Sequence, residues 1–182
     1  MALSTTQRGV LAGMSLGGVL SLLGLLVGLW AAPDALTPGN DLPARLAFVL
    51  SWDLLVIFWL IATIGLLARL RFFSPQDIDG AGLTTGTAAA KAQQALLQNT
   101  LEQVVLAVVV HLASAILLPR GDLAVLPIAA ISFTLGRALF CLGYRRGAAA
   151  RALGFALTFY PTVLLFILLV VRYLASVSGV ID

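Results

Sequence analysis

Four polar residues inside long apolar runs of this sequence could together bind a ligand. They are an amide, a carboxylate, a guanidinium and a phenol: Asn99, Glu102, Arg137 and Tyr144. On helices, Asn99 and Glu102 share one face and Arg137 and Tyr144 share another, because their spacings are i, i+3 and i, i+7. Ionisable groups in membrane helices are costly, so each is a functional hypothesis. These residues therefore predict a polar site at one level of a membrane.

Glu102 and Arg137 are predicted to lie at matched depths. The helical rise places Glu102 about 24 Å from Leu118 and Arg137 about 21 Å from Leu123. A tight turn at residues 119–121 would make the two helices antiparallel neighbours. We therefore predict that Glu102 and Arg137 pair. A buried pair that only fixes helix packing is the alternative to a ligand site.

Arginines at the same side of the predicted bundle add positive charge to this level. Arg151 opens the last apolar run, and Arg69 and Arg71 close the second. Four helices would then bring an amide, a carboxylate, a phenol and several guanidinium groups together. This gathering strengthens the case for a ligand site.

Two other ionisable residues, Asp53 and His111, are predicted about 10 Å below the opposite surface. They could form a mutual hydrogen bond of structural role, since the sequence offers no third group nearby for a relay. Neither has the neighbouring His, Cys or carboxylates that a metal site needs, so no metal is expected. The single cysteine, Cys141, stands in an apolar run, which favours a packed thiol over a reactive one.

Composition predicts the elements that carry these residues. Of 182 residues, 60% are hydrophobic and 10% are charged, and the mean hydropathy is +1.05, whereas an ordinary globular chain is about one quarter charged. This balance excludes a soluble fold and predicts one integral membrane domain over residues 1–182. The net charge of +3 comes from scattered residues without a basic block, which argues against a nucleic-acid partner.

Five apolar stretches meet or approach the roughly 20 residues that a bilayer core requires. They cover residues 10–32, 46–68, 101–118, 123–143 and 153–171. Prolines and glycines between them mark turns, and residues 73–90 form the one long loop. The predicted fold class is therefore all-α, a bundle of five transmembrane helices.

The first stretch could instead be a signal peptide, because Arg8 precedes it and Ala31 and Ala32 follow it. Its apolar length of about 21 residues exceeds the roughly 7 to 15 of a signal sequence, which favours a membrane helix. Small residues also recur on one helical face: Gly13, Gly17, Ser21, Gly24 and Gly28. Such a face lets another helix approach closely, and we expect that helix to come from the same chain.

The distribution of Lys and Arg in short loops predicts the orientation. Seven belong to the amino terminus and every second loop: Arg8, Arg69, Arg71, Lys91, Arg145, Arg146 and Arg151. Three belong to the other side: Arg45, Arg120 and Arg172. We expect a multi-pass protein of the plasma membrane, the inner membrane in a bacterium, with a cytoplasmic amino terminus and the carboxyl terminus on the far side.

Three parts of the sequence resemble the family of membrane-associated proteins in eicosanoid and glutathione metabolism (MAPEG), which includes microsomal glutathione transferases. Residues 98–102, Gln-Asn-Thr-Leu-Glu, are similar to its Asn-x-x-Glu motif. Residues 137–144, Arg-Ala-Leu-Phe-Cys-Leu-Gly-Tyr, are similar to its Arg-x-x-Tyr-x-x-Gly-Tyr motif. Arg151 matches the arginine that stabilises the glutathione thiolate in this family. The resemblance covers roughly residues 55–171.

This resemblance implies a four-helix core over about residues 46–175, with an extra helix before it over about residues 10–32. It also implies a homotrimer in the lipid bilayer, with glutathione as co-substrate and a lipophilic small molecule as the second substrate. Arg151 would be the catalytic residue. The substrate-binding residues would be Asn99, Glu102, Arg137, Tyr144 and Arg69.

The chain departs from the family pattern at Ala95, where glutathione-using members often have an arginine, and at Gln103 and Phe140, where tyrosines are usual. These changes remove contacts to the charged groups of glutathione. Two functions therefore stay open. One is a glutathione transferase or peroxidase-like enzyme, and the other is a non-catalytic lipid-binding or scaffold protein of the same fold. A transporter is disfavoured because the sequence shows neither a hydropathy repeat nor paired interrupted helices.

Overall fold

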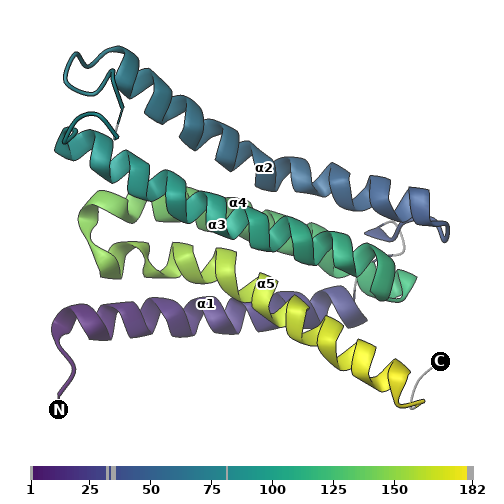
Figure 1. Ribbon diagram of the computed structural model, residues 1–182. Coiled ribbons are helices and arrows are strands. Elements are labelled where there is room, and N and C mark those ends of the chain that lie inside the picture. Colours follow the sequence, from purple (N-terminus) through teal and green to yellow (C-terminus); the bar gives the residue numbers. More distant parts are fainter. Residues whose placement is uncertain (1, 32, 34–35, 81, 180–182) are drawn as a thin grey trace.

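The computed structural model describes residues 2–31, 33, 36–80 and 82–179 (Figure 1). In these ranges the chain is helical and contains no strand. The α-helices are α1 (Thr5–Trp30), α2 (Leu42–Phe72), α3 (Ala88–Leu117), α4 (Val125–Gly143) and α5 (Ala148–Val177), and the 3-10 turns η2 (Arg120–Ala124) and η3 (Tyr144–Arg146) flank α4. Five helical segments here are long and apolar enough to cross a membrane. The predicted all-α transmembrane bundle is confirmed.

Most of the helices extend beyond the apolar stretches that predicted them, although α4 does not. The largest difference is at α3, which begins at Ala88 rather than near Leu101. Ala, Gln and Lys are strong helix formers, and they continue the helix past the apolar segment. The Thr87 side chain caps this start by accepting a hydrogen bond from the Ala90 N–H. Ala32, the predicted end of the first span, lies outside the described residues.

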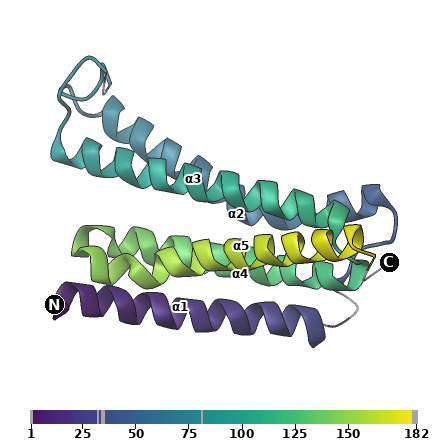
Figure 2. The ribbon, with the colours of Figure 1, turned by 60° about the horizontal axis from the view of Figure 1, so that its bottom comes forward.

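The helices form an antiparallel bundle in layers. The α2 and α3 helices lie together, α4 and α5 form the middle layer, and α1 covers the opposite side of that layer (Figure 2). The start of α1, the α2–α3 loop and η3 meet at one end (Figure 1). We call this the η3 end of the bundle. It carries the seven basic residues that the sequence assigned to one side.

The α3 and α4 helices are antiparallel, as their short connection predicts, but their backbones approach each other at few points. The α3 helix packs mainly on α2 and then on α5, and it meets α4 through side chains. In contrast, the predicted close approach at the glycine face of α1 is confirmed within the chain. A methyl group on Gly13 would lie 2.9 Å from the Leu153 backbone nitrogen, and one on Gly28 would lie 2.7 Å from the Val125 Cα.

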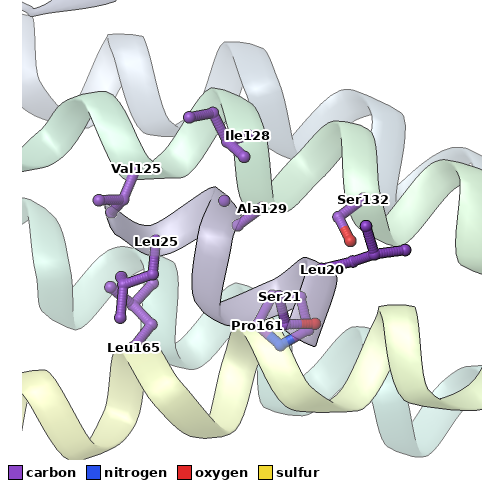
Figure 3. Close-up of a pocket in the computed structure, with 10 residues that line it drawn as sticks. Leu20, Ser21, Leu25, Val125, Ile128, Ala129, Ser132, Pro161 and Leu165 are labelled. Atoms are coloured by element: carbon purple, nitrogen blue, oxygen red, sulfur yellow. The ribbon is translucent and has the colours of Figure 1, made fainter. Parts of the chain in front are cut away.

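A proline inside α5 is accommodated by a side chain of α4. Pro161 lacks the N–H that would bond to the Leu157 carbonyl. Ser132 Oγ donates to this carbonyl at 2.9 Å instead. Beside them lies a cavity of about 30 Å³ between α1, α4 and α5 (Figure 3). Its volume is on the order of one water molecule, so the helices are close-packed here.

The α2–α3 loop is organised around the Asp77 carboxylate, which is 2% exposed. It accepts hydrogen bonds from Ser74 Oγ at 2.7 Å and from the backbone N–H and Oγ1 of Thr87 at 2.7 and 2.8 Å. These bonds favour the charged carboxylate, and the Ser74 hydroxyl contributes most to lowering the Asp77 pKa. The loop therefore ties the end of α2 to the start of α3.

The predicted hydrogen bond between Asp53 and His111 is confirmed and joins α2 to α3. His111 Nδ1 lies 2.6 Å from Asp53 Oδ1, and the two residues are 2% and 0% exposed. The second carboxylate oxygen, Asp53 Oδ2, is buried without a hydrogen-bond partner among the described residues. Water does not reach the two buried side chains. Removing one of them therefore leaves the other as a buried polar group without its hydrogen-bond partner.

We predict that His111→Leu destabilises the protein far more than the Asp53→Leu, His111→Leu double variant. Removing one partner of a buried pair costs roughly 3 to 5 kcal/mol, whereas replacing both by apolar groups can be nearly neutral. Thermal unfolding in detergent, followed by circular dichroism, measures the difference. The partly exposed pair of Asp122 and Arg172, at 2.8 Å, is the control, and Asp122→Asn should cost about 1 kcal/mol or less. Equal losses in the single and double variants would contradict the prediction.

Candidate functional site

A cavity of about 330 Å³ lies at the η3 end of the bundle, between α1, α3, α4 and α5. It is lined by Val10, Met14, Asn99, Phe140, Tyr144, Ala148, Arg151, Ala152 and Phe155. We call it the η3 cavity. Three of the predicted site residues, Asn99, Tyr144 and Arg151, meet on its wall. Its volume falls in the range of about 300 to 1,000 Å³ that is typical of small-molecule sites.

Glycines hold α4 and α5 together behind the η3 cavity. A methyl group on Gly136 would lie 2.8 Å from the Gly154 carbonyl oxygen, so the two backbones touch at this level. The chain reverses at Gly147, whose φ of +97° is the left-handed region that favours glycine. Arg151 then follows in the first turn of α5. This turn places the Arg151 guanidinium beside the Tyr144 ring.

Arg137 is fully buried and bonds only to neutral groups. Its Nη1 donates to Asn99 Oδ1 at 3.0 Å and to Thr100 Oγ1 at 3.4 Å, and its Nη2 donates to Thr158 Oγ1 at 2.9 Å. The side chain is 0% exposed, and Nε has no hydrogen-bond partner among the described residues. In the part of the chain that the structure describes, no carboxylate lies within ion-pair distance of Arg137. The buried positive charge is therefore without a counter-charge among the residues that the structure describes.

Aromatic rings partly compensate the charge. The Arg137 Cζ lies 4.4 Å from the centroid of the Phe140 ring, and the Arg151 Cζ lies 6.0 Å from the same centroid. Arg151 is also 4.6 Å from the centroid of the Tyr144 ring. Cation–π contacts of this kind contribute about 0.5 to 2 kcal/mol. The Phe140 ring thus contacts both arginines, at a position where the family that the sequence resembles usually has a tyrosine.

The bond to Arg137 fixes how Asn99 presents its amide. A guanidinium has only donors, so the Asn99 carbonyl oxygen must face Arg137. The Asn99 NH₂ is then free to donate on the side of the η3 cavity. The Arg151 guanidinium is likewise a donor, and the Tyr144 hydroxyl can be one. The polar part of the wall therefore suits a ligand that is anionic or rich in acceptors.

The predicted ion pair between Glu102 and Arg137 is wrong for a single chain. Glu102 is exposed and accepts a hydrogen bond from Gln98 Nε2 at 2.9 Å. The buried face of α3 passes through Thr100 instead, and this rotation turns Glu102 away from α4. Arg69 is exposed near the end of α2 and is not among the residues that line the η3 cavity. The structure thus gathers four of the six predicted site residues.

Sequence reasoning missed two residues of α5 that complete this arrangement. Thr158, which is 1% exposed, accepts from Arg137, and Phe155 lines the η3 cavity. Both follow Arg151 at spacings of i+4 and i+7, which place them on one helical face. That periodicity was the available signal. Val10 and Met14 of α1 carried no such signal, because nothing in their sequence context relates α1 to the site.

Comparison with known protein families gives one match. The profile of the MAPEG family matches residues 46–171, which is more than half of the chain. The matched range begins within α2 and ends within α5, so it contains Asn99, Arg137, Tyr144 and Arg151 and leaves out α1. No curated protein and no solved structure shows significant similarity to the chain.

We predict opposite stability effects for two substitutions at Asn99. Asn99→Asp gives Arg137 a carboxylate partner, and a hydrogen bond to a charged group contributes about 1.5 to 3 kcal/mol, so the unfolding temperature in detergent should rise. Asn99→Ala leaves an Arg137 donor unpaired and should cost about 1 to 3 kcal/mol. An unfolding temperature that falls in Asn99→Asp as much as in Asn99→Ala would contradict the assigned network.

Proposed function

The chain belongs to the MAPEG family, and we propose that it is a membrane-embedded glutathione transferase or peroxidase-like enzyme. It would activate the thiol of glutathione for attack on a lipophilic electrophile or peroxide. The observation that carries this proposal is the Arg151 guanidinium on the wall of the η3 cavity, which contacts aromatic rings and has no carboxylate within ion-pair distance in the described part of the chain. An anionic sulfur is a suitable partner for this group.

Arg151 would act on the thiol by favouring its charged form. A positive charge within about 4 to 6 Å lowers a thiol pKa, and the thiolate is the nucleophile. The Asn99 amide and the Tyr144 hydroxyl, on the same wall, would donate to the peptide carbonyls or carboxylates of glutathione. Arg137 lies behind Phe140 and would act as a positioning residue, because it orients Asn99. For Glu102 and Arg69, we propose that they bind substrate in the assembled protein, as the family resemblance implies.

The three departures from the family pattern are compatible with this proposal. Gln103 is buried within the chain, and the Phe140 ring contacts the two arginines Arg137 and Arg151. Ala95 lines a second hollow of about 370 Å³, which also includes Arg71 and Lys91. These cations can supply the charge that an arginine at position 95 would have given to a glutathione carboxylate.

Glu102 supports the proposal that the protein is a trimer. It lies at the start of the apolar segment of α3, a helix long and apolar enough to cross the membrane, and its side chain is exposed on the single chain. An acidic group on the outer surface of a membrane helix is costly unless it is paired or faces water. A second copy of the chain would cover Glu102 and Gln98 and remove this cost.

Lipid binding without catalysis is the second candidate function, because an apolar groove runs between α3 and α5. Its volume is about 770 Å³, and its lining includes Val109, Phe159 and Phe166. An acyl chain would fit such a surface. Calorimetry with glutathione on detergent-purified protein distinguishes the two functions. Glutathione binding supports the enzyme, and its absence supports lipid binding without catalysis.

We predict that Arg151→Ala abolishes the ultraviolet absorbance of the glutathione thiolate bound to the protein, together with conjugating activity. The fold should be retained, because among the described residues Arg151 makes no hydrogen bond or ion pair, and loss of its cation–π contacts with Tyr144 and Phe140 costs only about 0.5 to 2 kcal/mol. Arg146→Ala is the matched control, since Arg146 is exposed in η3 and does not line the η3 cavity. Absence of a thiolate signal in the wild type at saturating glutathione would refute the enzyme proposal. Equal behaviour of the two variants would refute the role of Arg151.

Asn99→Asp provides a second binding test. It replaces an NH₂ donor on the cavity wall by an acceptor, so glutathione binding should weaken about tenfold or more, given that a hydrogen bond to a charged group contributes about 1.5 to 3 kcal/mol. Calorimetry measures the affinity. Unchanged affinity in a variant with raised stability would show that the Asn99 amide does not touch the ligand.

We also propose that the η3 end of the bundle faces the cytoplasm. It carries seven of the ten basic residues that lie near helix ends or in turns, Arg137 being deeper within α4. A reporter fused after the last residue should therefore be inactive in the cytoplasm, whereas one inserted at Gly80 in the α2–α3 loop should be active there. Cytoplasmic activity of the carboxyl-terminal fusion would contradict this orientation.

A further inference from the structure

The η3 cavity has one wall that the family match does not include. Val10 and Met14 of α1 line it together with Asn99, Tyr144 and Arg151, whereas the MAPEG profile begins at residue 46. Both side chains are partly buried. The helix that precedes the family core thus contributes directly to the candidate site.

Backbone contacts hold α1 at a fixed distance from Arg151. A methyl group on Gly9 would lie 2.8 Å from the Ala149 Cβ, and one on Gly13 would lie 2.9 Å from the Leu153 backbone nitrogen. Gly17 meets Ala156 in the same way. The three contacts flank Arg151 on α5. Because Gly13 neighbours Met14, the position of Met14 relative to the guanidinium is set by the packing of two backbones.

Toward the carboxyl end of α1, the space between α1 and the neighbouring helices is smaller. At the level of Pro161 the cavity between α1, α4 and α5 is about 30 Å³ (Figure 3), which is on the order of one water molecule. Beyond it, a methyl group on Gly28 would lie 2.7 Å from the Val125 Cα. The ligand-sized space beside α1 is therefore at Met14.

The lining of the η3 cavity combines polar and apolar side chains. Asn99, Tyr144 and Arg151 carry polar groups, whereas the two α1 residues, Val10 and Met14, are apolar. A thiolate held at Arg151 would have these α1 side chains in the same cavity, where they offer an apolar surface to the carbon part of an electrophile. Methionine is flexible and polarizable, which suits it to contact varied apolar groups.

We infer that α1 forms the wall that receives the apolar part of the second substrate, and that Met14 is a specificity-determining residue that limits its size. This inference rests on the proposed function, because it takes the nucleophile to be a thiolate beside Arg151. The substrate class is an apolar electrophile such as an α,β-unsaturated aldehyde. In this reaction the sulfur bonds to the β-carbon, the electron pair of the double bond moves to the α-carbon, and that carbon takes a proton from water.

A series of 2-alkenals of increasing chain length tests the inference through the ratio of kcat/KM for long and short members. Met14→Ala should raise this ratio at least tenfold and Met14→Phe should lower it at least tenfold, since a methylene in an apolar pocket changes kcat/KM about 10- to 200-fold. The thiolate absorbance of bound glutathione should stay as in the wild type. Leu16→Ala is the control, because Leu16 is 50% exposed on the outer side of α1 and should leave the ratio unchanged.

A labelling experiment gives a readout that does not depend on turnover. In a Cys141→Ala background, S-hexylglutathione should slow the reaction of Met14→Cys with N-ethylmaleimide at least fivefold and leave Leu16→Cys unaffected. Two results would overturn the role of α1 but not the proposed function. One is an unchanged chain-length ratio with an intact thiolate signal, and the other is that S-hexylglutathione affects the labelling of Met14→Cys and Leu16→Cys equally. Absence of the thiolate signal in the wild type overturns the proposed function and this inference together.

Discussion

The fold around the candidate site depends on the accommodation of one buried guanidinium. Arg137 is 0% exposed in a bundle whose helices suit a membrane, and in the part of the chain described here it has no acidic partner. A charge in such a place is tolerated only with dense compensation. Asn99, Thr100 and Thr158 supply oxygen acceptors from two helices, and the Phe140 ring supplies a π face. These contacts fix α3, α4 and α5 relative to one another.

The sequence predicted the existence of the helices better than their pairing. Apolar length alone identified the spans, because each helix must satisfy its backbone inside the bilayer. It could not show that α3 begins at Ala88, since Ala, Gln and Lys continue a helix without adding to its hydropathy. Nor could it show that α3 packs mainly on α2, with fewer close approaches to α4. Helix packing in membranes depends on close fit at small residues. The contact between Gly136 and Gly154 lets α5 approach α4 closely.

The structure brings together four of the six residues predicted for the site, and one predicted pairing is wrong. Depth alone suggested that Glu102 would meet Arg137, but depth says nothing about rotation about the helix axis. One step of α3 is about 100°, so Asn99 and Thr100 can face Arg137 while Glu102 faces outward. The exposed carboxylate is the observation on which the proposed assembly rests, and the pattern of a single chain does not reveal its partner.

A ring without a hydroxyl at position 140 suits the same charge balance. The Phe140 centroid lies 4.4 Å from the Arg137 Cζ and 6.0 Å from the Arg151 Cζ. A phenolic hydroxyl at this position would need its own hydrogen-bond partner when buried, whereas an unsubstituted ring does not. Phe140 can therefore contact both cations through its ring without a further polar group to satisfy. Arg137 keeps its neutral oxygen partners, and Arg151 keeps its donors for a ligand in the cavity.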